Sequence, residues 1–265
     1  MTTTETDLRA EWARWHAERE RELRAPHGWL SLTALEWLDA TARTVAGLPG
    51  TWRVAPDGEA VELTATPTDG LTVDGCPVAG TQRLEPVDGK PGTIVVAGDR
   101  RIEVIRRTAA FALRVRDPQA PTRARFTGVP AYPVEERWVV AARYLPFDRP
   151  RRLTVDAVVD GLQHFPTAVG QVEFGLDGTT HRLLALSGAG TGLTLHFYDA
   201  TSGAETYGGG RLVRITEPAA GDLLEIDFNR TVNLPCAFTS YATCPLPPAE
   251  NRLAVAVAAG ERSPA

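Results

Sequence analysis

The side chains best suited to chemistry gather in the last quarter of the chain. Asp227 and Glu250 are the candidate catalytic residues, because a carboxylate held in a polar pocket can accept and return a proton. Arg211 and Arg252 are candidates for orienting a substrate, because a guanidinium binds a carboxylate or a phosphate through two parallel hydrogen bonds. Together these residues favour a site for a small polar or anionic molecule.

Other polar residues are predicted to contact the same substrate. Most lie near the four residues above, either before Arg211 or on and after the strand that contains Asp227, and one arginine comes much earlier. These candidates are Asp199, Tyr207, Asn229, Asn233 and Arg114. For Arg114 the alternative is a solvated, ion-paired face of a strand.

The strand expected at residues 223–230 separates apolar from polar side chains. Alternate residues of a strand point to opposite faces, so Glu225, Asp227 and Asn229 share one face. Asp199 follows the inward face of its own strand, and Arg211 opens a strand between the two in sequence. We therefore predict that Arg211 and the polar face around Asp227 meet in one pocket.

The same polar groups allow a second interpretation, a buried network that only supports the fold. The substitution Asp227→Asn separates the two interpretations. A structural Asp227 predicts a loss of stability of roughly a few kcal/mol, as for a broken buried pair. A functional Asp227 predicts nearly intact folding with loss of ligand binding or turnover.

The chain has three cysteines, of which Cys236 and Cys244 lie eight residues apart in a Pro-rich stretch. No histidine lies within that stretch to serve as a base or a zinc ligand. We predict structural, reduced thiols without bound metal at all three positions, including Cys76. A reactive thiol and a metal site are the alternatives.

The elements that must position these residues can be read from hydrophobic periodicity. Residues 6–24 show the spacing of three and four that is typical of an amphipathic helix. From residue 44 onward, short alternating runs separated by turns at intervals of about ten residues predict antiparallel strands. The Pro-rich loop is too apolar to remain in solvent, so we expect residues 237–247 to pack against the body.

These patterns predict a mainly β protein with two consecutive antiparallel β units, sandwich-like or barrel-like, behind an N-terminal amphipathic helix. The predicted bounds are 1–28 for the helix, 29–119 for a sandwich-like first unit and 126–265 for a barrel-like second unit that carries the Pro-rich loop. A Pro/Arg-rich stretch at 120–126 is the predicted connection.

Composition limits the possible partners. The 265 residues carry a net charge of −5, which does not favour nucleic acid. No apolar run has the length of a membrane span, and the N-terminus lacks the pattern of a secretory signal. The small number of cysteines is consistent with a reducing compartment, so we predict a cytoplasmic protein. The expected partner is a small-molecule ligand, and neither nucleic acid nor a membrane is expected. The oligomeric state is not predicted.

Four stretches resemble one family closely: GWLSLTALEWL, DATSGAETYGGGR, DFNRTVNLPCAFTSYATCPLPPAENRL and the closing AGE. Together they resemble the domain-of-unknown-function 1684 family of bacteria and archaea, over nearly the whole chain. One departure is Leu234, where that family more often has proline. The resemblance implies a soluble cytoplasmic protein and supplies no activity, cofactor or assigned catalytic residue.

Two classes of function follow from the residues. The first is an enzyme that acts on a small polar or anionic molecule by acid–base chemistry in the second β unit. The second is a non-catalytic ligand-binding or interaction module. A flavin-binding split barrel is a third possibility, but the sequence has no diagnostic flavin motif and no phosphate-binding loop, so no cofactor is predicted.

Overall fold

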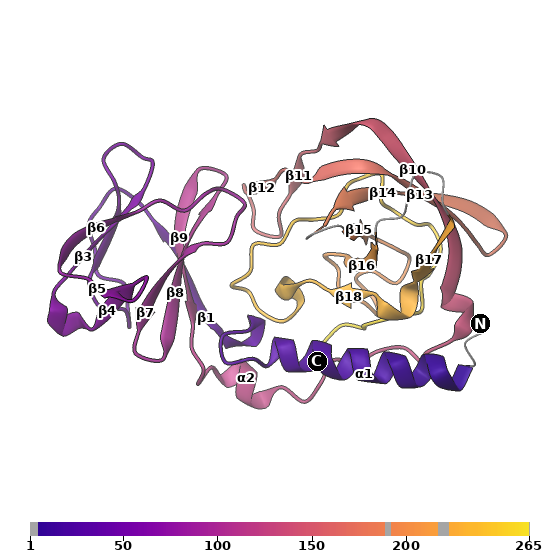
Figure 1. Ribbon diagram of the computed structural model, residues 1–265, viewed down its shortest axis with the longest axis horizontal. Helices are drawn as coiled ribbons and strands as arrows, with labels where there is room; N and C mark the ends of the chain where they lie inside the picture. The colour runs from indigo at the N-terminus through magenta and orange to yellow at the C-terminus, as the bar shows by residue number, and fades with distance from the viewer. Residues whose placement is uncertain (1–4, 189–191, 217–222, 265) are drawn as a thin grey trace. The chain divides into compact units, whose positions relative to one another are not determined.

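The computed structural model describes residues 5–188, 192–216 and 223–264 (Figure 1). It is mainly β, with 45% of residues in strands and 15% in helices, and every strand pairing in its sheets is antiparallel. The predicted fold class is therefore confirmed.

The chain divides into two compact units. The N-terminal β unit is Glu22–Phe126, and the C-terminal β unit combines the chain up to Arg21 with the chain from Thr127 onward. The division lies at the end of the Pro/Arg-rich stretch 120–126. The N-terminal helix is part of the C-terminal β unit.

The N-terminal β unit is a sandwich of two antiparallel sheets. A six-stranded sheet has the order β1-β9-β8-β7-β4-β5, and a three-stranded sheet has the order β2-β3-β6. Buried residues from both sheets, such as Trp52, Leu63 and Val104, form one core. The elements are η1 (Trp29–Ser31), β1 (Leu32–Leu38), β2 (Thr51–Val54), β3 (Val61–Ala65), η2 (Pro67–Asp69), β4 (Leu71–Val73), β5 (Cys76–Pro77), β6 (Gly80–Leu84), β7 (Thr93–Ala97), β8 (Arg100–Arg107), β9 (Ala110–Arg116) and α2 (Pro121–Arg125).

The C-terminal β unit is built on a seven-stranded antiparallel sheet with the order β17-β10-β13-β14-β15-β16-β18. Its helices are α1 (Glu5–Leu23), η3 (Glu136–Trp138), η4 (Phe228–Arg230) and η5 (Pro235–Ala237). Its strands are β10 (Val139–Arg152), β11 (Val155–Asp156), β12 (Gln163–His164), β13 (Thr167–Leu176), β14 (Thr179–Ser187), β15 (Gly192–Phe197), β16 (Arg211–Thr216), β17 (Leu223–Asp227) and β18 (Val232–Asn233), of which β11 and β12 form a separate two-stranded sheet.

This sheet is curved around an aromatic core. Phe228 contacts both Phe174 and Phe197, with ring centroids 5.5 and 5.8 Å apart. The first strand in the order, β17, and the sixth, β16, line one cavity, which requires the sheet to curl toward closure. The arrangement is a half-barrel, with α1 running along one side of the unit (Figure 1).

Helix α1 is held to the unit by polar contacts as well as by its apolar face. The indole Nε1 of Trp12 donates to the Asn229 carbonyl oxygen at 2.6 Å. Arg19 donates to the Asn233 carbonyl oxygen and to the Glu261 carboxylate, at 2.9 and 3.1 Å. The helix predicted at residues 6–24 is therefore a fixed side of the C-terminal β unit. Neither α1 nor any other helix within the described ranges is both long and apolar enough to cross a membrane.

The Pro-rich loop is packed against the C-terminal β unit. Ala242, Thr243, Pro247 and Pro248 are buried. The His164 ring nitrogen Nε2 lies 2.5 Å from the Thr243 carbonyl oxygen. The loop therefore packs along the two-stranded sheet of β11 and β12, where the backbone of Leu246 also bonds to Asp156.

Candidate functional site

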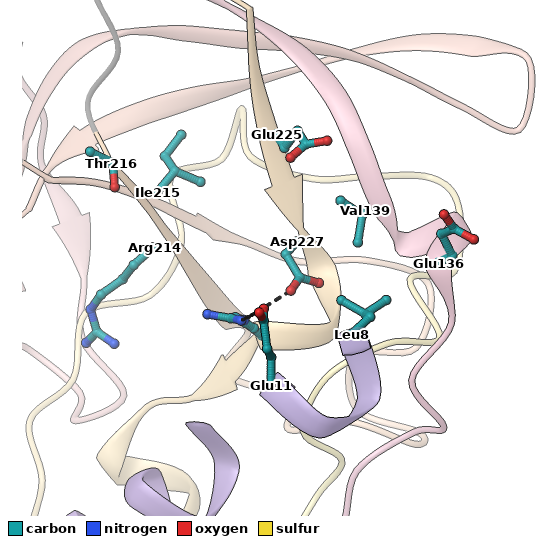
Figure 2. Close-up of a pocket in the computed structure, with 10 residues that line it drawn as sticks. Leu8, Glu11, Glu136, Val139, Arg214, Ile215, Thr216, Glu225 and Asp227 are labelled. Carbon is teal, nitrogen blue, oxygen red and sulfur yellow. Dashed lines mark ion pairs between the residues drawn. The ribbon is translucent and has the colours of Figure 1, made fainter. Parts of the chain in front are cut away.

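A cavity of about 540 Å³ lies in the C-terminal β unit between α1, the start of β10 and the strands β16 and β17 (Figure 2). We call it the α1–β17 pocket. It brings together residues that are more than 200 positions apart in the sequence. Its described lining residues are Leu8, Glu11, Glu136, Val139, Arg214, Ile215, Thr216, Glu225, Asp227 and Arg230.

The alternation of β17 directs two carboxylates into this pocket. Ile226 is fully buried in the core, so its neighbours Glu225 and Asp227 point the opposite way. The two polar residues pair with Ala141 and Val139 of β10, which fixes their register. The polar face expected from the sequence thus faces a cavity, and the hypothesis of a functional site at Asp227 has a physical basis.

Asn229 leaves that face because the strand ends at Asp227 and continues as η4. Its side chain is buried and bonds to the backbone of Glu135, accepting at 3.1 Å and donating at 3.0 Å. It also donates to Asp227 Oδ1 at 2.9 Å. Asn229 therefore holds Asp227 in position and does not line the pocket.

The pocket is acidic. Arg230 pairs with Asp227 at 3.1 Å and reaches Glu11 at 3.8 Å. Neither Glu136 nor Glu225 forms an ion pair with any residue that the structure describes. Among the described lining residues, four carboxylates face two guanidinium groups, those of Arg230 and Arg214, so this part of the lining carries an excess of negative charge.

Arg211 is enclosed elsewhere and does not line the α1–β17 pocket. Its side chain is 1% exposed, and Nη2 lies 2.6 Å from Asp199 Oδ2. The guanidinium also donates to three backbone carbonyl oxygens of the C-terminal segment, those of Val257, Ala259 and Glu261. Asp199 in turn accepts from Thr201. The expected meeting of Arg211 with the polar face of β17 is not observed, because Arg211 and Asp199 satisfy each other inside the fold.

A second buried network accounts for Asn233. Its backbone N–H donates to Glu261 Oε2 at 2.7 Å, and its side-chain Nδ2 donates to the Arg262 carbonyl oxygen at 2.8 Å. Glu261 also binds Arg19 of α1. Asn233 therefore joins β18, α1 and the C-terminal segment and serves the fold.

The remaining candidates are separated from the pocket. Glu250 and Arg252 are exposed on the Pro-rich loop, with the Arg252 guanidinium 4.4 Å from the centre of the Tyr198 ring. Tyr207 is half-buried and bonds to Cys236. Of the sequence candidates, only Asp227 lines the pocket.

Arg114 lies in the N-terminal β unit, on a face of β9 that other residues cover. It donates to both carboxylate oxygens of Glu103, at 2.9 and 3.0 Å, and Arg116 joins the same carboxylate. The pKa of Glu103 is lowered, because the charges and hydrogen bonds of these arginines outweigh a large opposing effect of burial. Trp29 covers both guanidinium groups at about 5 Å. The solvated face considered from the sequence is instead a buried ion-pair cluster.

Sequence reasoning missed several pocket residues. Arg230 had a local signal, because it lies three residues after Asp227, its partner. Glu11 and Glu136 had none, since only the folding of the half-barrel brings α1 and η3 to β17. Across the described ranges, no group of three or more His, Cys, Asp or Glu side chains is placed to hold a metal ion.

Comparison with known proteins gives a family. A family model described as "Protein of unknown function (DUF1684)" matches residues 124–262, more than half of the chain. Three of the four stretches singled out in the sequence lie inside this match, and GWLSLTALEWL lies outside it, so the match is shorter than the sequence resemblance indicated.

One similar solved structure is the solution NMR structure of the uncharacterized protein from gene locus rrnAC0354 of Haloarcula marismortui. The sequence identity is 29%, the TM-score is 0.45, and the matched region covers 53% of this chain and 78% of the other chain. The comparison with curated proteins found no match.

Proposed function

The chain belongs to the DUF1684 family, and since that family has no assigned activity, we propose from the geometry that the protein binds a small molecule carrying a positively charged nitrogen in the α1–β17 pocket. The observation that carries the proposal is a cavity of about 540 Å³ lined by four carboxylates. That volume falls within the usual range of small-molecule sites, about 300–1,000 Å³.

The charges of the pocket favour a cation over an anion. Glu136 and Glu225 have no ion-pair partner among the described side chains, while Asp227 and Glu11 share Arg230. An anionic ligand would add repulsion to this excess of carboxylates. A cation bound beside these carboxylates would offset the excess. Opposite charges in contact near a protein surface attract each other with an energy that reaches kcal/mol values.

The apolar part of the lining suggests what else the ligand carries. Leu8, Val139 and Ile215 contribute aliphatic side chains beside the carboxylates. A short hydrocarbon portion bound there would lose apolar surface to solvent, which is favourable. An alkylamine or alkyldiamine combines the two properties.

Binding is favoured over acid–base catalysis for two reasons. The anion clamp on which the enzyme hypothesis depended used Arg211 and Arg252, and neither lines the pocket. Asp227, the remaining proton-transfer candidate, is engaged by Arg230 and by both the backbone and the side chain of Asn229. Those bonds occupy the carboxylate with groups of the protein itself.

A charge-matched pair of probes tests this proposal. We expect 1,4-diaminobutane to raise the Tm of the protein, because a ligand that binds only the native state stabilises it by about 2.7 kcal/mol at one hundred times its Kd. Succinate has the same four-carbon length with the opposite charge and is expected to leave the Tm unchanged. Scanning fluorimetry and titration calorimetry at constant ionic strength measure both effects.

Carboxylate-to-amide variants locate the site. The double variant Glu136→Gln/Glu225→Gln should lose the response to the diamine, because it removes two charges and changes little volume. Glu250→Gln is the matched control, since Glu250 is exposed and outside the pocket. Equal Tm shifts in all three proteins, or an equal response to succinate, would rule out this pocket as a cation site.

A further inference from the structure

The two cysteines of the Pro-rich loop are close neighbours in space. The backbone N–H of Cys236 donates to Cys244 Sγ, with N and S 3.3 Å apart. That nitrogen is one bond from the Cys236 Cα, so the two residues lie within reach of a disulfide, whose Cα atoms are usually about 4.4–6.8 Å apart. Cys236 is half-exposed and Cys244 is buried. The arrangement leaves one thiol open to a small reagent and keeps the other behind it.

Several donors converge on the Cys236 sulfur. The Cys244 thiol, the Tyr207 hydroxyl and the backbone N–H of Ala237 interact with it. The pKa of Cys236 is lowered, first by the Cys244 thiol and then, against the effect of burial, by Tyr207 and the amides. The pKa of Tyr207 is raised, first by burial and then by its bond to Cys236, so its hydroxyl keeps the proton that it donates.

Tyr198 interacts with both an arginine and Cys236. The Arg252 guanidinium covers the Tyr198 ring at 4.4 Å. Burial has the largest effect on the pKa of Tyr198 and raises it. Arg252 lowers this pKa, and Cys236 raises it. Hydrogen-bond donors such as those at Cys236 stabilise a thiolate, which is the nucleophilic form of cysteine.

We propose that Cys236 is an oxidation site for hydroperoxides and that Cys244 resolves the oxidised residue as an intramolecular disulfide. In the first step the Cys236 thiolate attacks the terminal peroxide oxygen, a sulfur–oxygen bond forms and the oxygen–oxygen bond breaks. The alkoxide or hydroxide that leaves takes up a proton, so that an alcohol or water is released and Cys236 becomes a sulfenic acid.

In the second step the Cys244 sulfur attacks the sulfenic sulfur of Cys236. The sulfur–sulfur bond forms, the sulfur–oxygen bond breaks and the hydroxyl leaves as water with the proton of Cys244. The two thiols together lose two electrons and the peroxide gains them. The donor bonds of Tyr207 activate the first step, and the position of Cys244 at the Cys236 amide favours the second.

Oxidation of the reduced full-length protein with one equivalent of hydrogen peroxide tests the proposal. We expect thiol titration to fall from three to one, and peptide mass spectrometry to find Cys236 linked to Cys244 with Cys76 still reduced. Cys76 is the internal control, because it is an exposed thiol. Faster oxidation at Cys76, no loss of thiols, or disulfides between molecules would each overturn the proposal.

Single substitutions separate the roles of the two cysteines. Cys244→Ser should trap the sulfenic acid at Cys236, which dimedone labels, while Cys236→Ser should leave Cys244 unreactive. Tyr207→Phe keeps both thiols and should slow alkylation of Cys236 by iodoacetamide several-fold at neutral pH, with the pH–rate profile moved to higher pH. Dimedone labelling at Cys244, or an unchanged profile in Tyr207→Phe, would contradict the assigned roles.

Discussion

Replacement of Arg211 by methionine is expected to lower the free energy of unfolding by roughly 3–5 kcal/mol, the usual cost of removing one partner from a buried ion pair. The Arg211 and Asp199 side chains are 1% and 0% exposed, with N and O 2.6 Å apart. Methionine has a similar reach but donates no hydrogen bond. It therefore leaves the Asp199 carboxylate buried without a cation and releases the C-terminal segment from three bonds.

The ion pair between Arg182 and Glu173 supplies the matched control. Its N–O distance is also 2.6 Å, but its side chains are 59% and 29% exposed. Arg182→Met should cost less than about 1 kcal/mol, since solvent screens an exposed pair. Urea denaturation gives both values, with the m-value reporting any change in the denatured state.

The double variant Asp199→Leu/Arg211→Met should recover part of the stability lost in Arg211→Met, because it leaves no unpaired buried charge. If Arg211→Met instead costs no more than Arg182→Met, the Asp199–Arg211 network is not a structural support and its burial needs another explanation.

The polar face of β17 shows what the sequence could predict. Alternation placed Glu225 and Asp227 on one side of a strand, and both line the pocket. The same rule failed at Asn229, because strand periodicity holds only while the strand continues. At Phe228 the chain turns into η4, and the next side chain points into the fold.

Arg211 shows why the partners of a buried polar group could not be predicted from the sequence. Three of its bonds are to backbone carbonyl oxygens 46–50 residues away, and a carbonyl oxygen has no signature in the sequence. The phase of Asp199 correctly suggested an inward carboxylate. Nothing local showed that Arg211 would be the partner of this carboxylate.

Arg114 illustrates the same limit on a strand. Phe111 and Leu113 predicted one buried face of β9, and the polar alternate face was expected in solvent. Glu103 and Trp29 cover that face instead. Which strand face is covered depends on segments distant in sequence, so periodicity predicts two faces without saying how many are buried.

A buried histidine makes the stability of the protein depend on pH. His196 lies on β15 and is 3% exposed, and its ring atom Nε2 has no hydrogen-bond partner among the described groups. Burial disfavours the charged ring and lowers the pKa of His196 from 6.5 to about 4. The side-chain Nδ2 of Asn251 donates to the His196 carbonyl oxygen at 2.9 Å and holds this part of β15 in place.

We expect this histidine to remove about 3 kcal/mol of stability as the pH falls through the interval between its two pKa values. Between pH 6.5 and about 4 the unfolded chain binds a proton at His196 and the folded protein does not, so the stability rises with pH in that interval. Each pKa unit corresponds to about 1.4 kcal/mol, which gives the total above and about 2 kcal/mol already lost at pH 5.

The substitution His196→Gln keeps a hydrogen-bond donor and removes the titration. The free energy of unfolding by urea at pH 8 and pH 5 should therefore fall by about 2 kcal/mol more in the wild-type protein than in the variant, with pH 8 as the baseline of each. An equal fall in both proteins would mean that the folded state accommodates the charged imidazolium, and that the ring of His196 is open to solvent or to an anionic partner.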